Sequence, residues 1–197
     1  MNRQTILFAS LALLFIAALF VTQTLLPPRM NGSAIDPPLA VEDFTLHSVD
    51  GSVSLGDFRG KYVILYFGYT SCPDICPDSL AKFREALSKL GERAGDFQVI
   101  FISVDPSRDS VEYCDVYAKR FSPDFIGITG SEAEIESVTK ALGIFYQLNE
   151  PDDGGFYTVD HTASALILDR EGNLIMTWPY GLTPDQMEDD LRILLRR

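Results

Sequence analysis

Two cysteines set four positions apart are the residues of this chain best suited to chemistry. Cys72 and Cys76 bracket the string Cys-Pro-Asp-Ile-Cys, and they follow an apolar run, 62–67, that predicts a buried strand. We expect a helix to begin at the pair, and residues four apart lie on one face of a helical turn, so both sulfurs can point at one ion. A helix N-terminus also favours the thiolate, the form that attacks disulfides and binds metals. The spacing by itself leaves a redox dithiol and a metal site open.

The elements that must position this pair are strands alternating with helices. After the strand at 62–67 comes a helix whose apolar stripe ends at Gly91, then a second buried strand at 99–104 and a helix from about 110 to 121. The remaining predicted elements are two helices opened by capping boxes and two strands joined by a turn: helices beginning at 131–134 and 183–186, and strands at 163–168 and 174–178.

This order of elements predicts the fold class α/β. Strands that alternate with helices imply a mostly parallel sheet covered on both faces. A closing pair of antiparallel strands followed by a helix is typical of the thioredoxin-like fold, in which a central mixed sheet is flanked by helices. In open α/β sheets ligands bind at the carboxyl edge of the strands, which is where Cys72 and Cys76 are expected to lie.

The bulk composition narrows the class of protein. The chain has 197 residues and a formal net charge of −12, with 46% hydrophobic and 22% charged residues, as expected for one globular domain with an apolar end. An acidic surface repels phosphate backbones, so nucleic acid is not an expected partner. Three cysteines are too few for a disulfide framework, which favours a site made by two of them and a third that stands apart.

The N-terminal segment predicts a membrane anchor. No charged residue occurs from Thr5 to Leu26, and such a run can cross the ~30 Å hydrocarbon core of a bilayer as a helix. A cleaved signal peptide usually has an apolar region of only about 7–15 residues followed by a small-x-small site, which is missing at this border. We therefore expect one uncleaved N-terminal transmembrane helix.

This interpretation divides the chain into a membrane anchor at residues 1–26, a proline-rich extended linker at 27–40 and a single domain at 41–197. Arg3 precedes the span, in weak agreement with a cytoplasmic tail and an external domain. The chain shows no long Arg- and Ser-rich presequence. This favours a bacterial inner membrane, with the domain in the periplasm, over an organelle import route.

Several strings together resemble one known family. Residues 66–77, Tyr-Phe-Gly-Tyr-Thr-Ser-Cys-Pro-Asp-Ile-Cys-Pro, resemble the signature of the Sco/SenC copper-chaperone family. So do residues 57–61, residues 104–109 and the step Asp160-His161-Thr162 before a predicted strand. The resemblance runs from about Phe44 to the C-terminus. The combination of the cysteine string with a downstream Asp-His makes it specific.

The resemblance implies a thioredoxin-like metallochaperone rather than an enzyme. Members of the family bind copper and serve assembly of the dinuclear copper centre of cytochrome c oxidase, as metallochaperone, as thiol reductant of the oxidase subunit, or both. Carried over position by position, the copper ligands are Cys72, Cys76 and His161. The implied cargo is Cu(I), with Cu(II) as a second option. The implied partners are the copper-centre subunit of the oxidase and, as a candidate donor, another copper chaperone.

The chemistry of these side chains agrees with the resemblance. Two thiolates and one imidazole suit a soft ion such as Cu(I). Three ligands leave a position open for handover, whereas a closed structural zinc site needs a fourth protein ligand. Asp160 is a candidate for orienting the His161 ring and equally for capping a local turn. Tyr69 is expected to form a wall of the site, Cys114 to be a small buried hydrophobe and His47 a surface residue.

Other functions stay open at this point. The main alternative is a membrane-tethered thiol-disulfide oxidoreductase that reduces the cysteines of the oxidase copper site, with Cys72 and Cys76 as the redox-active pair and no need of His161. Two features count against a general oxidoreductase: the Cys-x-x-x-Cys spacing, where thioredoxins have Cys-x-x-Cys, and the lack of a proline just before Ala163. A peroxidase, a redox or copper sensor and a catalytic zinc site are more remote alternatives.

Overall fold

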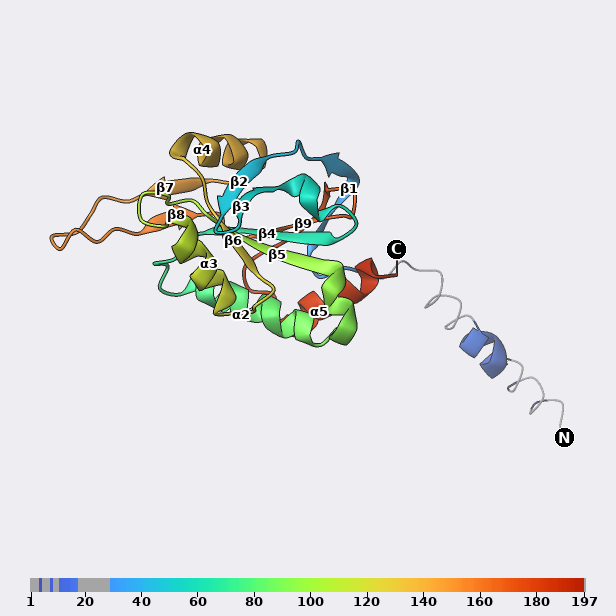
Figure 1. Cartoon of the computed structure of the whole chain (residues 1–197). Coiled ribbons are helices and arrows are strands. Elements are labelled where there is room, and N and C mark those ends of the chain that lie inside the picture. Colours follow the sequence, from blue (N-terminus) through green and yellow to red (C-terminus); the bar gives the residue numbers. More distant parts are fainter. Residues whose placement is uncertain (1–3, 5–7, 9–10, 18–28, 197) are drawn as a thin grey trace.

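A six-stranded mixed sheet forms the centre of the molecule (Figure 1). The computed structural model describes residues 4, 8, 11–17 and 29–196. The strands run in the order β1-β10-β9-β4-β5-β6. Their bounds are β1 (Ser33–Ala40), β4 (Tyr62–Gly68), β5 (Phe97–Ser103), β6 (Ile126–Ile128), β9 (Ala165–Leu168) and β10 (Asn173–Trp178).

The parallel half of the sheet contains the two strands that the apolar runs predict. Every residue of β4 and of β5 is buried, as expected for strands covered on both faces. They pair in parallel from Tyr62 opposite Phe97 to Gly68 opposite Ser103, so their carboxyl ends lie side by side. Strand β9 pairs antiparallel with β4, and β10 with β9, which makes the sheet mixed. This is the thioredoxin-like α/β arrangement with a mixed sheet that the sequence predicts. The expectation of a mostly parallel sheet is wrong, because three of the five strand pairings are antiparallel.

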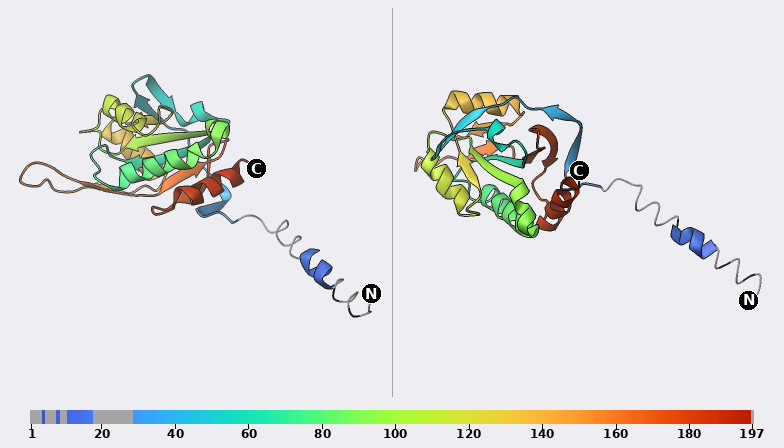
Figure 2. Two further views of the ribbon diagram at one scale, coloured as in Figure 1. Left: turned by 90° about the horizontal axis from the view of Figure 1, so that it is seen from below. Right: turned by 45° about the vertical axis from the view of Figure 1, so that its right-hand side comes forward.

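Helices cover both faces of the sheet. Helices α2 (Ile75–Ser88) and α5 (Pro184–Leu194) lie side by side on one face, and α4 (Glu132–Ala141) lies on the other (Figures 1 and 2). The predicted capping boxes are confirmed, because Ser131 and Thr183 accept the backbone N–H groups at the third positions of α4 and α5. The remaining elements are α3 (Val111–Lys119), the hairpin of β2 (Thr45–Ser48) and β3 (Gly51–Ser54), and the 3-10 helices η1 (Leu55–Phe58) and η2 (Gly91–Asp96).

The apolar core has two layers, one on each face of the sheet. Trp178 and Phe83 belong to the layer under α2 and α5, and Ile135 belongs to the layer under α4. Burying one large apolar side chain contributes about 1.5–3 kcal/mol, so the two layers provide much of the stability. Cys72 is partly buried and contacts both layers. The thiol pair therefore lies at the end of the sheet where the two layers meet.

A small second hairpin stands outside the main sheet. Strands β7 (Tyr146–Leu148) and β8 (Val159–His161) pair antiparallel, and the loop between them projects from the body (Figure 1). The sequence does not predict these strands, because three-residue strands are too short to show a periodic pattern. His161 is the last residue of β8, opposite Tyr146.

The segment expected to be an extended linker differs in part from the prediction. Residues 33–40 form β1, which pairs antiparallel with β10 at the edge of the sheet, so the ordered sheet begins before position 41. An edge strand tolerates proline because its outer N–H groups need no partner. Pro37 and Pro38 fall between the paired residues Ala34 and Leu39, where the register shifts. Residues 27 and 28 of the expected linker lie outside the described part of the chain.

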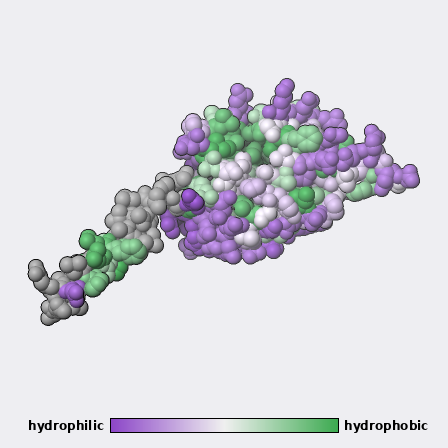
Figure 3. All heavy atoms as spheres, turned by 180° about the vertical axis from the view of Figure 1, so that it is seen from behind, coloured by the Kyte–Doolittle hydropathy of each residue, from purple (hydrophilic) through white to green (hydrophobic). Residues whose placement is uncertain are grey.

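Most of the expected membrane anchor, residues 1–26, also lies outside the described residues. Residues 11–17 are helical, and the side chains of Leu13, Leu14 and Phe15 are exposed. Figure 3 shows this short stretch as hydrophobic, whereas the face of the body in the same view carries both hydrophilic and hydrophobic areas. Among the residues that the structure describes, no helix has both the length and the apolar character needed to cross a membrane.

Candidate metal centre

The thiol pair lies at the junction of β4 and α2, at the carboxyl edge of the sheet. A tight turn follows β4, in which the backbone N–H of Cys72 donates to the carbonyl of Tyr69 (3.2 Å). Helix α2 begins at Ile75, so only Cys76 lies in its first turn. The expectation that both cysteines share one helical turn is therefore wrong, because the proline that follows Cys72 disfavours helical geometry there. The pair still meets, since the backbone N–H of Cys76 points at Cys72 Sγ over 3.5 Å.

Gly68 makes room for the buried sulfur of this pair. A Cβ atom built at Gly68 would lie 2.5 Å from Cys76 Sγ and 3.1 Å from the ring of Phe101. Cys76 is 0% exposed, so the packed interior leaves no free space into which its sulfur could move. Gly68 is the last residue of β4. Its main role in the structure is to leave this space.

His161 approaches the pair from the β7–β8 hairpin. Its Nε2 atom lies 3.4 Å from Cys76 Sγ, and its Nδ1 atom lies 3.1 Å from the carbonyl oxygen of Thr162. A carbonyl can only accept, so Nδ1 carries the proton and Nε2 presents its lone pair to the sulfurs. This is the tautomer that a metal at Nε2 requires. Asp160 is exposed, and the group that orients the ring is the carbonyl of Thr162.

Three donor atoms thus converge from two distant parts of the chain, the segment that holds Cys72 and Cys76 and the hairpin that holds His161. One ligand atom each of Cys72, Cys76 and His161 lies within 4.8 Å of the others, the one such group of His, Cys, Asp or Glu residues found in the described part of the chain. Cys114 lies apart from it, fully buried on α3 with its sulfur 4.0 Å from the carbonyl of Asp109, as expected for a small hydrophobe. Two sulfurs and an imidazole nitrogen form a donor set suited to a soft cation.

The two thiols have opposite electrostatic character. A hydrogen bond from Cys76 lowers the pKa of Cys72 far below its usual value. The same hydrogen bond, together with burial, raises the pKa of Cys76. The pair therefore holds one proton at neutral pH, on Cys76, and Cys72 is the thiolate. Cys72 is also the more exposed of the two sulfurs.

Two tyrosines form aromatic walls around the imidazole. The rings of Tyr69 and Tyr66 meet the ring of His161 edge-on, at centroid distances of 5.9 and 6.3 Å. Burial raises the pKa of both phenols, so both stay neutral beside the thiolate. Tyr69 is a wall of the site, as the sequence predicts. Tyr66 is a second wall, whereas the sequence predicts for it only a place in a buried strand.

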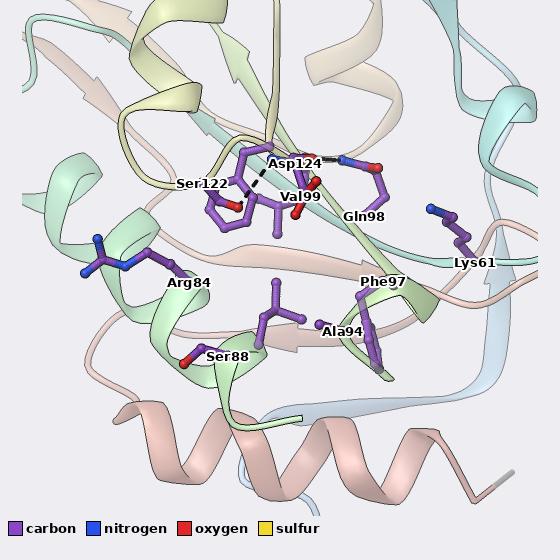
Figure 4. Close-up of a pocket in the computed structure, with 12 residues that line it drawn as sticks. Lys61, Arg84, Ser88, Ala94, Phe97, Gln98, Val99, Ser122 and Asp124 are labelled. Atoms are coloured by element: carbon purple, nitrogen blue, oxygen red, sulfur yellow. Dashed lines mark hydrogen bonds between the residues drawn. The ribbon is translucent and has the colours of Figure 1, made fainter. Parts of the chain in front are cut away.

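A separate hollow lies at the opposite end of the sheet (Figure 4). This pocket of about 440 Å³ lies beside the first residues of β4 and β5, between Lys61 and Arg84. Gln98 on its wall donates to the carbonyls of Val99 and Asp124. Its lining includes neither a cysteine nor a histidine. The hollow therefore has no part in the metal centre.

Comparison with known proteins identifies the family. A family model described as SCO1/SenC matches residues 33–196. The chain belongs to the SCO1/SenC family. This membership confirms the resemblance carried by residues 66–77 and by the Asp160-His161 step.

Two curated SCO1/SenC relatives show the extent of the match. The chain is 40% identical over 164 residues to the mitochondrial SCO1 homolog 1 of Arabidopsis thaliana, covering 82% of this chain and 47% of that protein. It is 36% identical over 152 residues to an SCO2-like protein of Rickettsia conorii, covering 76% of this chain and 74% of the relative. The match thus spans about half the length of the Arabidopsis relative.

Solved SCO1/SenC structures share the fold described above. Arabidopsis thaliana ScoI, solved with copper bound, superposes with a TM-score of 0.74 at 39% identity, covering 79% of this chain and 98% of that one. Yeast Sco1, also solved with copper bound, superposes with a TM-score of 0.73 at 29% identity, covering 81% of this chain and 90% of that one.

Proposed function

We propose that this chain is a copper metallochaperone for assembly of the dinuclear copper centre of cytochrome c oxidase. It holds the metal between Cys72 Sγ, Cys76 Sγ and His161 Nε2. The observation that carries the proposal is the convergence of these three donors within 4.8 Å, with the imidazole already in the ligating tautomer. Family membership and the copper-bound structures of relatives support it.

The donor set favours Cu(I) as the cargo. Thiolates prefer soft ions, and three ligands leave one coordination position for an incoming group. Cys76 is buried, whereas Cys72 and His161 are partly exposed, so one side of the site is open. An acceptor thiolate can enter there and replace Cys72 first. Cu(II) is a second cargo that the imidazole can also ligate.

The N-terminal segment supports a membrane-tethered location. The described helical stretch 11–17 exposes its apolar side chains, and the charge-free run from Thr5 to Leu26 has the length of a transmembrane helix. We place the domain on the periplasmic side of a bacterial inner membrane. There it meets the copper-centre subunit of the oxidase as recipient and another copper chaperone as donor.

Anaerobic Cu(I) titration against a chromogenic chelator tests the proposal. The Cys114→Ala protein is expected to bind one Cu(I), and adding His161→Ala is expected to weaken binding tenfold or more, about 1.4 kcal/mol. His47→Ala is the matched control, because His47 is exposed, lies beside Glu134 and is not one of the three clustered ligand residues. Equal affinity of the His161 and His47 variants would contradict the proposed ligand set.

The asymmetry of the thiol pair favours one second function, reduction of the cysteines of the oxidase copper site. Cys72 is a partly exposed thiolate and Cys76 is a protonated neighbour. Cys72 can attack a substrate disulfide and release one substrate thiolate. Cys76 then breaks the mixed disulfide, which leaves the pair oxidised and the substrate reduced. An oxidised copper-site peptide tests this function, and reduction at the same rate in His161→Ala would establish it separately from copper binding.

A further inference from the structure

The hairpin that carries His161 needs support from outside itself. Strands β7 and β8 form a two-stranded sheet of their own, so no hydrogen-bond ladder ties them to the strand that ends at the thiol loop. An isolated two-stranded hairpin is marginally stable in water. The distance between His161 and the thiol pair must therefore be set by side chains that join the hairpin to the body.

Arg108 makes that connection through Tyr157, four positions before His161. Its Nη1 atom donates to the carbonyl of Tyr157 over 2.7 Å, and its guanidinium carbon lies 3.5 Å from the centre of the Tyr157 ring. The Tyr157 hydroxyl in turn donates to Asp105 Oδ1 over 2.9 Å. One residue of the hairpin is thus held by its backbone, its ring and its hydroxyl.

Arg108 is itself held in place by a buried carboxylate, that of Asp105. Arg108 Nε donates to Asp105 Oδ2 over 2.5 Å, and Asp105 is 1% exposed. A buried carboxylate paired with a guanidinium resists displacement, because separating the pair would leave a charge without a partner. The two residues lie in loop 104–109, which directly follows β5. The backbone N–H of Val104 donates to the carbonyl of Gly68 over 2.8 Å, so this loop begins beside the end of β4.

The same loop also holds the cysteine segment. Asp109 accepts from the backbone N–H of Thr70 over 2.7 Å and from its hydroxyl over 2.5 Å. Thr70 lies two positions before Cys72. Loop 104–109 therefore binds the thiol loop through Asp109 and the histidine hairpin through Arg108. It fixes the position of the hairpin relative to the thiol loop.

Tyr69 contacts both Arg108 and His161 at the site itself. The guanidinium of Arg108 lies 5.6 Å from the centre of the Tyr69 ring, within cation–π range. The same ring meets the His161 imidazole edge-on at 5.9 Å. A planar guanidinium can stack between Tyr157 and Tyr69 while donating in its own plane, and a lysine ammonium cannot.

We propose that Arg108 is a positioning residue that holds His161 Nε2 at the thiol pair. This inference rests on the proposed function, because it requires that His161 ligate the metal. Arg108 touches neither sulfur nor the imidazole nitrogen that binds, and it acts through Tyr157 and Tyr69. Its Nη2 atom is buried with no hydrogen-bond partner among the described residues, so the guanidinium is held through Nε, through Nη1 and by the ring of Tyr157.

The test is a double-mutant cycle on Cu(I) affinity, in the Cys114→Ala protein. Arg108→Ala is expected to weaken Cu(I) binding about tenfold, the usual effect of removing a group that orients a ligand, and by no more than His161→Ala does. Arg108→Lys is expected to behave like Arg108→Ala, because it keeps the charge and loses the planar fork. Added to His161→Ala, Arg108→Ala should change nothing further. Arg84→Ala is the matched control, since Arg84 is exposed on α2.

Three results would overturn the proposed positioning role of Arg108. The first is wild-type affinity in Arg108→Ala alongside a weakened His161→Ala. The second is an equal loss from Arg108→Ala with and without His161, which would place its effect on the fold or the thiols. The third is wild-type Cu(I) affinity in Arg108→Lys. Wild-type affinity in His161→Ala itself would instead refute the proposed function, and with it the positioning role of Arg108. If Arg108→Ala does not fold, Tyr157→Phe serves in the same cycle, with a smaller loss expected only when His161 is present.

Discussion

Cys76 Sγ lies 3.4 Å from His161 Nε2, although 85 positions separate the two residues in the chain. They belong to different elements: Cys76 lies in the first turn of α2, after β4 of the six-stranded sheet, and His161 ends β8 of the small hairpin. Their closeness therefore depends on how the hairpin is held against the body, and on the free space beside the sulfur. Both can be changed by single substitutions.

Gly68→Ala is expected to damage the fold and the metal site together. The added methyl would lie 2.5 Å from Cys76 Sγ, so the sulfur or the strand must move. Overpacking of a buried site costs typically about 1–3 kcal/mol of unfolding free energy. Urea unfolding and Cu(I) titration measure the two effects. Gly95→Ala is the matched control, because nothing lies within 4 Å of its added Cβ. Equal stability of the two variants would contradict the close contact.

Alkylation by iodoacetamide is expected to select Cys72 even in mildly acidic buffer. The hydrogen bond from Cys76 lowers the pKa of Cys72, whereas burial helps to raise the pKa values of Cys76 and Cys114. The rate at Cys72, followed by mass spectrometry, should therefore change little between pH 6 and 8. Cys76→Ala removes the donor, so the Cys72 pKa rises and its rate becomes pH-dependent. A rate in the unmodified protein that rises about tenfold per pH unit would contradict this assignment.

The thiol pair is expected to release one proton when copper binds near neutral pH. Cys72 has a lowered pKa and is already a thiolate, while Cys76 has a raised pKa and must lose its proton. Affinity should thus rise about tenfold per pH unit between pH 7 and 8, where free imidazole is largely neutral. Two ordinary thiols would give about a hundredfold rise. Titration at several pH values, corrected for the chelator, distinguishes the two, and Cys114→Ala should leave the slope unchanged.

Asp190 is expected to be a main determinant of stability. This buried carboxylate accepts from the backbone N–H groups of Asn31 (2.6 Å) and Gly32 (2.9 Å) and from the indole of Trp178 (2.9 Å). Asp190→Asn keeps the shape but puts an amide donor against these donors, which should cost roughly 2–3 kcal/mol of unfolding free energy. Fluorescence of the single tryptophan during urea unfolding measures it. The control is the exposed neighbour Asp189→Asn, and equal stabilities would count against the role of Asp190.

The sequence predicts well those elements whose signals are local. The apolar run at 62–67 is a buried strand, and the capping boxes at Ser131 and Thr183 begin helices as expected. Each of these signals lies within a few residues of the element it predicts. The cysteine spacing likewise indicates a site at a strand end, because the two residues lie only four positions apart, at the junction of β4 and α2.

The features that depend on distant contacts could not be predicted in this way. Residues 33–40 look like a linker because of their prolines, and they form a strand because β10 offers an edge. The placement of His161 depends on two three-residue strands and on the Arg108–Tyr157 contact, none of which has a periodic pattern. The family resemblance singled out residues 104–109 without indicating what they contact.

X-ray absorption at the copper edge tests the central claim most directly. We would load the Cys114→Ala protein with one equivalent of Cu(I) and compare it with the same protein carrying His161→Ala or His47→Ala. The account predicts two sulfur scatterers and one nitrogen scatterer in the parent and in His47→Ala, and loss of the nitrogen in His161→Ala. A first shell that is identical in all three proteins would contradict a copper site built from Cys72, Cys76 and His161.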